Sequence, residues 1–256
     1  MSDLKIHIWS HPRTGSTYMY HTLKQAYEPT VGLDEPLWNT KTQSTDVINS
    51  NFVDVLKTVD NVDSIVSKHH CGHETVVRGT MTDDWNRYKD MYNYNIFLCR
   101  KNIINTCISN LMLINNKMDR KNNYESYWSS DDGLFYVNIE QFIGVFNSYV
   151  GQLISVMLSP QVKFDEVVIY EELSTNPSEM LEILDVTTKY PVKNSNIELV
   201  NLYTPKDYKK IVGNYSEVAA RQNNYLINYL PDLFCSHGHD YHGELNTTFI
   251  KEVLSR

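Results

Sequence analysis

The stretch that most constrains the fold is the segment KIHIWSHPRTGSTYMYHTLKQAY at residues 5–27. Its pattern predicts a strand over residues 5–9, a tight turn over 11–17 and a helix over 18–27. Gly15 allows the backbone of the turn to approach a ligand closely, and the first N–H groups of the helix point back towards the turn. We therefore interpret the turn as a loop that binds an anion of phosphate size.

This loop differs from that of the nucleoside triphosphatases, whose G-x-x-x-x-G-K-[ST] pattern has a lysine before the hydroxyl residue. Here Gly15 is followed directly by Ser16 and Thr17, and the positive charge lies at Arg13. An ordinary strand-to-helix connection without a ligand is the alternative, because Arg13 and Ser16 could simply cap the helix. Other segments of the chain are needed to decide between the two.

Length and charge limit the functions that such a loop could serve. A chain of 256 residues can bury one good core, so we expect a single α/β domain over residues 1–256. The net charge of -8, from 23 Lys+Arg and 31 Asp+Glu, argues against a nucleic-acid partner. No apolar run approaches the ~20 residues that span a bilayer, and no signal-peptide core opens the chain, so we expect no membrane partner and a cytoplasmic location. The oligomeric state is left open.

The order of apolar segments predicts a central parallel β-sheet flanked by helices. Further strands are expected at 64–68, 95–99 and 166–169, of which the continuous apolar run NIFLC at 95–99 is the clearest. Helical spacing or helix-start signals occur between and after the strands, at residues 45–59, 83–92, 103–115, 138–158, 177–185 and 216–229. Alternation of this kind is typical of an α/β fold.

Three stretches lack such periodicity. Residues 28–44 are rich in Pro, Thr and Asn, and we expect a loop lying over the site. Residues 116–132 are polar and aromatic, and the segment 116–137 is interpreted as a lid or an acceptor-loop insertion. The tail beyond residue 231 is short and polar.

Several segments, in the same order along the chain, resemble the PAPS-dependent sulfotransferases. They are HPRTGSTYMYHTL, the strand end KHH at 68–70, FLCRKNIINTCIS, VVIYEELSTNPSEMLEIL and KKIVGNY. The resemblance covers most of the chain from residue 5 to about residue 230 and implies a P-loop-like α/β fold. It also implies transfer of a sulfuryl group from 3′-phosphoadenosine 5′-phosphosulfate (PAPS) to a hydroxyl of a small molecule, carbohydrate or peptide.

The resemblance further implies which residues contact the donor: Arg13, Thr14, Gly15, Ser16, Thr17, Arg100, Ser109, Tyr170, Lys209 and Lys210. The loop would hold the 5′-phosphosulfate, and Arg100 with Ser109 would hold the 3′-phosphate. Lys101 is an alternative to Arg100, because Ser109 lies eight residues after Lys101 and nine after Arg100. We favour Arg100 for its bidentate guanidinium. The segment containing Lys209 lacks the first glycine of the family pattern, so whether it closes over the nucleotide stays open.

Sulfuryl transfer explains why these residue types recur. Like phosphoryl transfer, it passes through a loose transition state, so catalysis is chiefly positioning and stabilisation of negative charge, for which Arg13 and Lys68 are the expected cations. The acceptor hydroxyl loses a proton, and His70 is the expected base, because a neutral histidine suits this task. In the K-x-H pattern of the family that the chain resembles, the lysine faces the sulfuryl group and the histidine faces the acceptor, which a strand permits because residues i and i+2 share one side. We expect no metal, because the loop lacks the lysine–hydroxyl pair that organises magnesium.

A zinc site is an alternative that the histidines and cysteines raise. One cluster contains His69, His70, Cys71 and His73, and another contains Cys235, His237, His239 and His242. Neither spacing matches a zinc-finger pattern, and in the first cluster His69 and His73 are interpreted as surface or outer-layer residues. Arg100 could instead pair with a carboxylate, and Tyr170 could be a core residue.

Two other functions remain as alternatives to a sulfotransferase. A P-loop-type nucleotide kinase would use the Gly-Lys-Ser/Thr sequence, which this loop lacks, and acidic magnesium ligands after a strand. A non-catalytic nucleotide- or zinc-binding protein would keep Arg13 and Arg100 but would have no base. His70 is therefore the residue that separates an enzyme from a binding protein.

Overall fold

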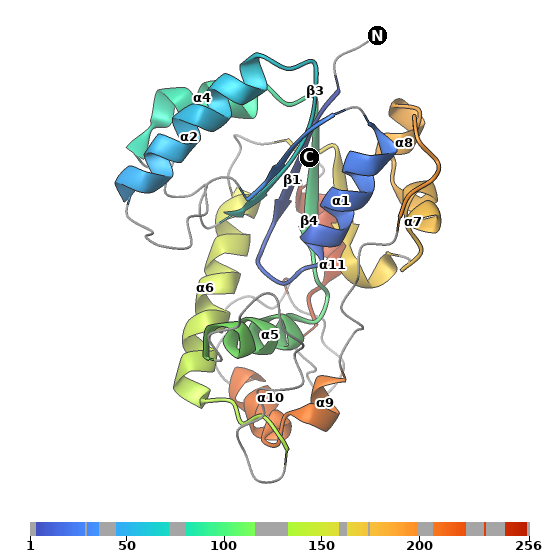
Figure 1. Ribbon diagram of the computed structural model, residues 1–256. Coiled ribbons are helices and arrows are strands. Elements are labelled where there is room, and N and C mark those ends of the chain that lie inside the picture. Colours follow the sequence, from blue (N-terminus) through green and yellow to red (C-terminus); the bar gives the residue numbers. More distant parts are fainter. Residues whose placement is uncertain are drawn as a thin grey trace. The chain divides into compact units, whose positions relative to one another are not determined.

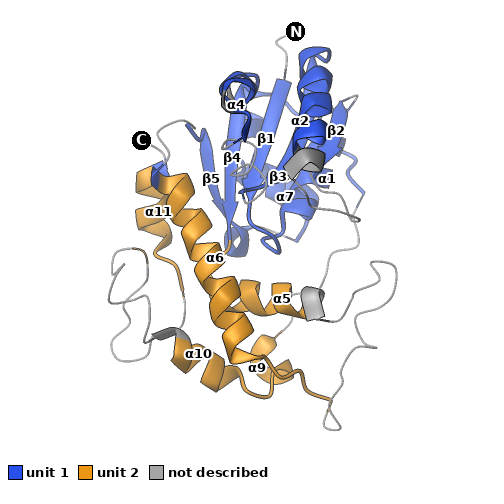
Figure 2. Cartoon of the chain, turned by 90° about the vertical axis from the view of Figure 1, so that its left-hand side faces the viewer, with its two compact units in different colours: residues 1–99, 158–202, 254–256 blue, residues 100–157, 203–253 orange. Residues whose placement is uncertain are grey.

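The computed structural model describes residues 4–28, 30–35, 45–71, 80–115, 133–158, 163–173, 175–198, 207–223, 233 and 244–254. The chain forms two compact units, coloured separately in Figure 2. Unit 1 comprises residues 1–99, 158–202 and 254–256, and unit 2 comprises residues 100–157 and 203–253. The expectation of one domain stays a prediction, because two compact units can belong to a single domain.

Unit 1 is built on a five-stranded sheet with the order β2-β3-β1-β4-β5, and every neighbouring pair is parallel (Figure 1). The strands are β1 (Leu4–Ser10), β2 (Val31–Asp34), β3 (Ser64–His70), β4 (Tyr94–Cys99) and β5 (Glu166–Ile169). Helices flank this sheet, which confirms the predicted α/β class with a central parallel sheet. Because all strands run the same way, the residues that follow them gather at one edge.

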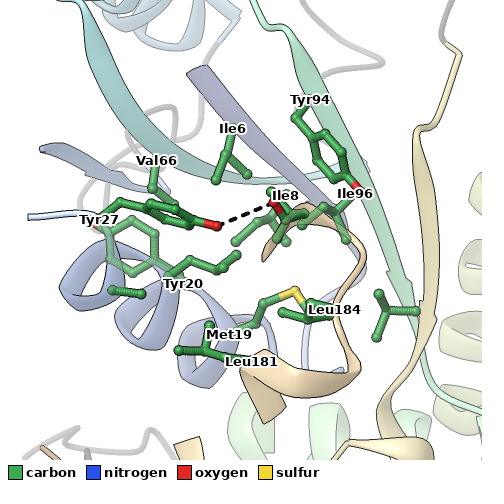
Figure 3. Close-up of a cluster of buried hydrophobic side chains, with 14 of the residues drawn as sticks. Ile6, Ile8, Met19, Tyr20, Tyr27, Val66, Tyr94, Ile96, Leu181 and Leu184 are labelled. Atoms are coloured by element: carbon green, nitrogen blue, oxygen red, sulfur yellow. Dashed lines mark hydrogen bonds between the residues drawn. The ribbon is translucent and has the colours of Figure 1, made fainter. Parts of the chain in front are cut away.

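The helices of unit 1 that matter for the site are α1 (Ser16–Ala26), α2 (Thr45–Asp60), α4 (Thr82–Lys89), α7 (Pro177–Ile183) and α8 (Val186–Lys189). On one face of the sheet, alternate strand residues such as Ile6, Ile8 and Ile96 are fully buried. They form one apolar cluster with Met19 of α1 and Leu181 of α7 (Figure 3). This packing holds the start of α1 against the end of β1.

The opposite face of the sheet is aromatic and is covered by α2 and α4. Trp9 of β1 packs edge-on against Trp85 of α4, with ring centroids 5.6 Å apart. Phe52 of α2 packs against Tyr88 of α4 at 5.0 Å. Strand residues of odd number in β1 therefore face one helical layer and those of even number face the other, as the alternation of a strand requires.

Unit 2 is helical in the part that the structure describes, with α5 (Ile103–Asn115), α6 (Ile139–Leu158), α9 (Tyr208–Ile211), α10 (Tyr215–Asn223) and α11 (Thr247–Leu254). Phe135, which precedes α6, joins the end of α9: its N–H donates to the Ile211 oxygen at 2.9 Å, and its oxygen accepts from the Gly213 N–H at 3.0 Å. Asn214 adds a pair of 2.9 Å hydrogen bonds to the backbone of Val137.

Among the described helices, α6 is long and apolar enough to cross a membrane by length and composition alone. The expectation of no membrane partner stays a prediction. The buried side chains of α6 recur at helical spacing: Phe142, Phe146, Tyr149, Val150 and Leu153. A single buried stripe of this kind is also typical of a helix that packs against its own protein.

Two of the stretches without periodicity depart from the expectations, and the third lies outside the described residues. The predicted loop at 28–44 contains strand β2, so that prediction is wrong for Val31–Asp34; residues 36–44 lie outside the described part. The polar tail contains α11, whose apolar Ile250 and Leu254 are buried. Of the proposed lid, residues 116–132 lie outside the described part, as do residues 224–229 of the expected last helix.

Candidate functional site

The loop between β1 and α1 has the sharp turn that its sequence predicts. Arg13 and Gly15 both adopt left-handed backbone conformations, with φ of 68° and 85°. The Thr14 hydroxyl donates to the His11 oxygen at 2.8 Å, and the Tyr18 N–H donates to the Gly15 oxygen at 3.0 Å. The chain thus reverses within a few residues, and α1 begins directly at Ser16 with its N-terminal end at the loop.

Tyr170 lies against this loop. It opens a single turn of 3₁₀-helix directly after β5, and a Cβ atom built on Gly15 would overlap its ring. Burial and the nearby hydroxyl of Tyr170 raise the pKa of Tyr18 to about 12. The predicted donor-binding residues Gly15 and Tyr170, which are far apart in the sequence, are therefore neighbours in unit 1.

Lys68 reaches the same loop from the carboxyl end of β3. Its side chain is 1% exposed, and its ammonium lies 2.8 Å from the Thr17 hydroxyl oxygen, which accepts a hydrogen bond from it. The ammonium also pairs with the carboxylates of Asp34 and Glu35, each at 2.8 Å. These three contacts use the three N–H bonds of the ammonium. A buried charge is costly unless it is paired and hydrogen-bonded in this way.

His70 lies two residues further along β3 and is mostly buried. Its Nε2 is 2.9 Å from Glu35 Oε1, and its Nδ1 is 3.5 Å from Ser10 Oγ at the end of β1. Burial of Glu35 would raise the pKa of its carboxyl group, but the hydrogen bond to His70 and the charges of His70 and Lys68 hold that pKa well below its usual range. Glu35 is therefore an ionised bridge between the expected cation and the expected base.

Asp34 and Glu35 are site residues that the sequence analysis missed. Both lie in the stretch 28–44, which its composition predicts to be a loop, although an apolar run, Val31-Gly32-Leu33, precedes them. That run, followed by two acids, was the available signal of a strand with polar residues at its carboxyl end. The pairing with β3 continues past the strand, because the Glu35 N–H donates to the Lys68 oxygen at 2.9 Å.

His11 is the first residue of the loop, and its side chain is fully buried. Its ring packs edge-on against Phe97 of β4 with centroids 6.3 Å apart. Burial, with a smaller contribution from the charge of His70, lowers the pKa of His11 to about 3. His11 is therefore neutral at physiological pH and adds no charge to the loop.

The residues expected to hold the 3′-phosphate belong to unit 2. Arg100 directly follows β4 and is half-buried, and Ser109 is buried in α5. Asn102 caps α5 by accepting the Asn105 N–H at 2.9 Å. The Lys101 ammonium pairs with Glu244 at 2.9 Å, so Lys101, the alternative to Arg100, already has a carboxylate partner.

Lys209 and Lys210 also belong to unit 2, in α9. Both are exposed, and Lys210 pairs with Asp207 at 3.2 Å within the same turn. An exposed ion pair of this kind contributes little to stability. The hydrogen bonds to Phe135 hold the segment that follows these lysines.

A metal site remains a separate question. Among the residues that the structure describes, no group of three or more His, Cys, Asp or Glu side chains could hold a metal ion. His73 and the cluster of Cys235, His237, His239 and His242 lie outside those residues. The expectation of no metal therefore stays a prediction.

Unit 1 thus brings together the loop, Lys68, His70 and Tyr170, with two carboxylates added to the predicted set. This arrangement can hold an anionic group at the loop and present a histidine beside it. Comparison of the chain with protein-family models, with curated proteins and with solved structures found no match.

Proposed function

We propose that the protein is a PAPS-dependent sulfotransferase acting on a hydroxyl of a small molecule, carbohydrate or peptide. The observation that carries this proposal is the 2.8 Å contact between the Lys68 ammonium and Thr17, in the first turn of α1 next to the loop. It links Thr17, which the resemblance assigns to the donor, to the strand that carries the expected cation Lys68 and the expected base His70. The loop without a P-loop lysine and the sequence resemblance add support.

In the proposed reaction the acceptor oxygen attacks the sulfur in line with the bond to the nucleotide. The new S–O bond forms as the bond between sulfur and the bridging phosphate oxygen breaks, and the electron pair leaves with 3′,5′-adenosine bisphosphate. His70 takes the acceptor proton, while Arg13, Lys68 and the first N–H groups of α1 stabilise the charge that builds on the leaving group. No metal is needed for this step, since the positive charge comes from side chains.

The two carboxylates on Lys68 set a condition on donor binding. An anionic donor has to compete with Asp34 and Glu35 for the ammonium, and in water-excluded surroundings like charges repel strongly. Asp34 is 40% exposed and Glu35 20% exposed. Asp34 can therefore turn towards solvent when the donor binds, whereas Glu35 stays with His70.

The same carboxylates favour a nucleotide kinase as the second candidate. A kinase needs acidic side chains at or after the end of a strand to hold magnesium, and Asp34 ends β2 while Glu35 follows it. Their contacts with Lys68 and His70 argue for the first candidate, because those partners would have to be given up to a metal. The nucleotide that the protein binds therefore decides between the two candidates.

Thermal unfolding separates the two candidates. We expect 3′,5′-adenosine bisphosphate to raise the melting temperature, since a ligand at 100 times its Kd stabilises by about 2.7 kcal/mol. ADP, with or without magnesium, should raise it less. A larger shift with ADP and magnesium would favour the kinase, and no shift with any of the three would remove both. Transfer from PAPS is then assayed with phenols, sugars and tyrosine peptides.

A further inference from the structure

Glu35 occupies an unusual position beside the expected base. It follows the edge strand β2 and has a left-handed backbone, with φ of 49°, which residues other than glycine seldom adopt. Its backbone N–H donates to the Lys68 oxygen, and its carboxylate contacts Lys68 and His70. Contacts of the backbone and of the side chain therefore both hold this conformation. Backbone outliers of this kind cluster at functional sites because the surroundings have to maintain them.

This conformation aims one carboxylate at two partners. Oε1 lies 2.8 Å from the Lys68 ammonium and 2.9 Å from His70 Nε2. Asp34, the neighbouring acid, pairs with the same ammonium at 2.8 Å. Glu35 therefore connects the cation at the loop to the imidazole.

We propose that Glu35 is a positioning residue, which holds His70 in the orientation and tautomer that accept the proton of the acceptor; this inference rests on the proposed function. An ionised carboxylate at Nε2 makes this nitrogen the protonated one, so that Nδ1 carries the lone pair. Nδ1 lies 3.5 Å from Ser10 Oγ, a long contact that the acceptor hydroxyl can replace. The acceptor proton then moves to Nδ1 as the new bond to sulfur forms. The resulting imidazolium remains paired with the Glu35 carboxylate, which stabilises it.

The test compares Glu35→Gln with the matched control Asp34→Asn. Both substitutions remove one negative charge from the same ammonium, so both should leave the affinity for 3′,5′-adenosine bisphosphate unchanged or raise it. Only Glu35→Gln alters the partner of His70. We expect the kcat of Glu35→Gln to lie about 10–100-fold below that of Asp34→Asn, the loss seen when a carboxylate that orients a metal-bound histidine is removed.

A double-substitution cycle shows whether Glu35 acts through His70. If it does, adding Glu35→Gln to His70→Ala should lower the rate no further than His70→Ala alone. Glu35→Asn serves if Glu35→Gln fails to fold, because asparagine tolerates the left-handed backbone and is too short to replace the contact. It should lose rate in the same way.

The outcomes separate this inference from the proposed function. A parent protein that neither binds 3′,5′-adenosine bisphosphate nor transfers a sulfuryl group would overturn both. If the parent transfers and Glu35→Gln, or its substitute Glu35→Asn, keeps the rate of Asp34→Asn, the positioning role is overturned and the sulfotransferase stands. A full additional loss of rate in the double variant would likewise show that Glu35 does not act through His70.

Discussion

The side-chain charge and the backbone conformation of Arg13 affect the protein in different ways: the charge is expected to bind the donor, and the backbone conformation lowers stability. Its left-handed conformation costs about 1–2 kcal/mol for a residue with a side chain, and the proposed function explains why an arginine stands there. Arg13→Ala should weaken binding of 3′,5′-adenosine bisphosphate by about 1.5–3 kcal/mol, the value of one charge-assisted contact, and should lower turnover as well. Isothermal titration and single-turnover rates measure the two effects.

Two further substitutions of Arg13 separate the effect of its charge from that of its backbone. Arg13→Lys keeps the charge without the guanidinium fork and should recover part of the affinity, whereas Arg13→Gly should bind as poorly as Arg13→Ala yet unfold at the same or a higher temperature, because glycine adopts the left-handed conformation freely. Unchanged affinity and rate in Arg13→Ala would mean that the loop is only a turn.

Substitution of Gly15 tests how closely Tyr170 packs on the loop, provided that the cost of the left-handed backbone is measured separately. A Cβ at Gly15 would overlap the Tyr170 ring, whereas a Cβ at Gly133, which also has a left-handed backbone with φ of 72°, would meet nothing within 4 Å. Gly133→Ala should therefore cost only the backbone term of about 1–2 kcal/mol. Gly15→Ala should cost more in urea unfolding and should also impair nucleotide binding. Equal losses in the two variants would show that Tyr170 moves aside easily.

At the scale of elements, a buried polar network joins the sheet to α4. His7 Nδ1 and Ser67 Oγ are 2.8 Å apart, and the Tyr88 hydroxyl lies 3.3 Å from His7 Nδ1 and 3.2 Å from His69 Nδ1. The Tyr92 hydroxyl donates to that of Tyr88 at 3.2 Å. Polar side chains in a closed core of this kind are costly unless every one is satisfied.

This network should make the fold acid-sensitive. Burial, together with the charge of His69, holds the pKa of His7 well below its ordinary value, so the folded state takes up fewer protons than an unfolded histidine of pKa ~6.5. Stability is then fully present above ~6.5 and is lost as the pH falls below it. Between pH 7 and 5, where carboxylates stay ionised, His7→Gln should flatten the decline in unfolding free energy measured with urea.

The control for this prediction is Tyr92→Phe. It removes a hydroxyl from the same network but no group that titrates in this range, so its pH dependence should parallel that of the parent protein. His11, with a pKa of about 3, adds to the decline in the same direction. A His7→Gln protein with the parent slope would show that His7 is not the source of the acid sensitivity.

At the scale of the whole molecule, the choice between nucleotides tests the residues that the resemblance assigns to the 3′-phosphate. Arg100 and Ser109 of unit 2 should form a site for the 3′-phosphate, so 3′,5′-adenosine bisphosphate should bind more tightly than 5′-AMP. Arg100→Ala should remove most of that difference. Lys101→Ala is the control and should preserve it, because the Lys101 ammonium pairs with Glu244. Equal binding of the two nucleotides to the parent protein would contradict the assignment.

Local pattern alone was enough to predict the opening strand, turn and helix, and the buried strands at 95–99 and 166–169. Each of these depends on residues close in sequence: a turn glycine, a continuous apolar run, or a helix start such as Asn176, whose side chain accepts the Ser178 N–H. The sequence also determined that Lys68 and His70 share one side of a strand, because side chains alternate.

Only the tertiary structure decided what Lys68 and His70 contact. Strand β2 is four residues long, too short to show a period, and it forms by pairing Val31–Asp34 with residues 65–68. That pairing, between segments far apart in the chain, places Asp34 and Glu35 on the ammonium and the imidazole. The strand order, with β1 between β3 and β4, is likewise set by long-range packing, for which local propensity carries no information.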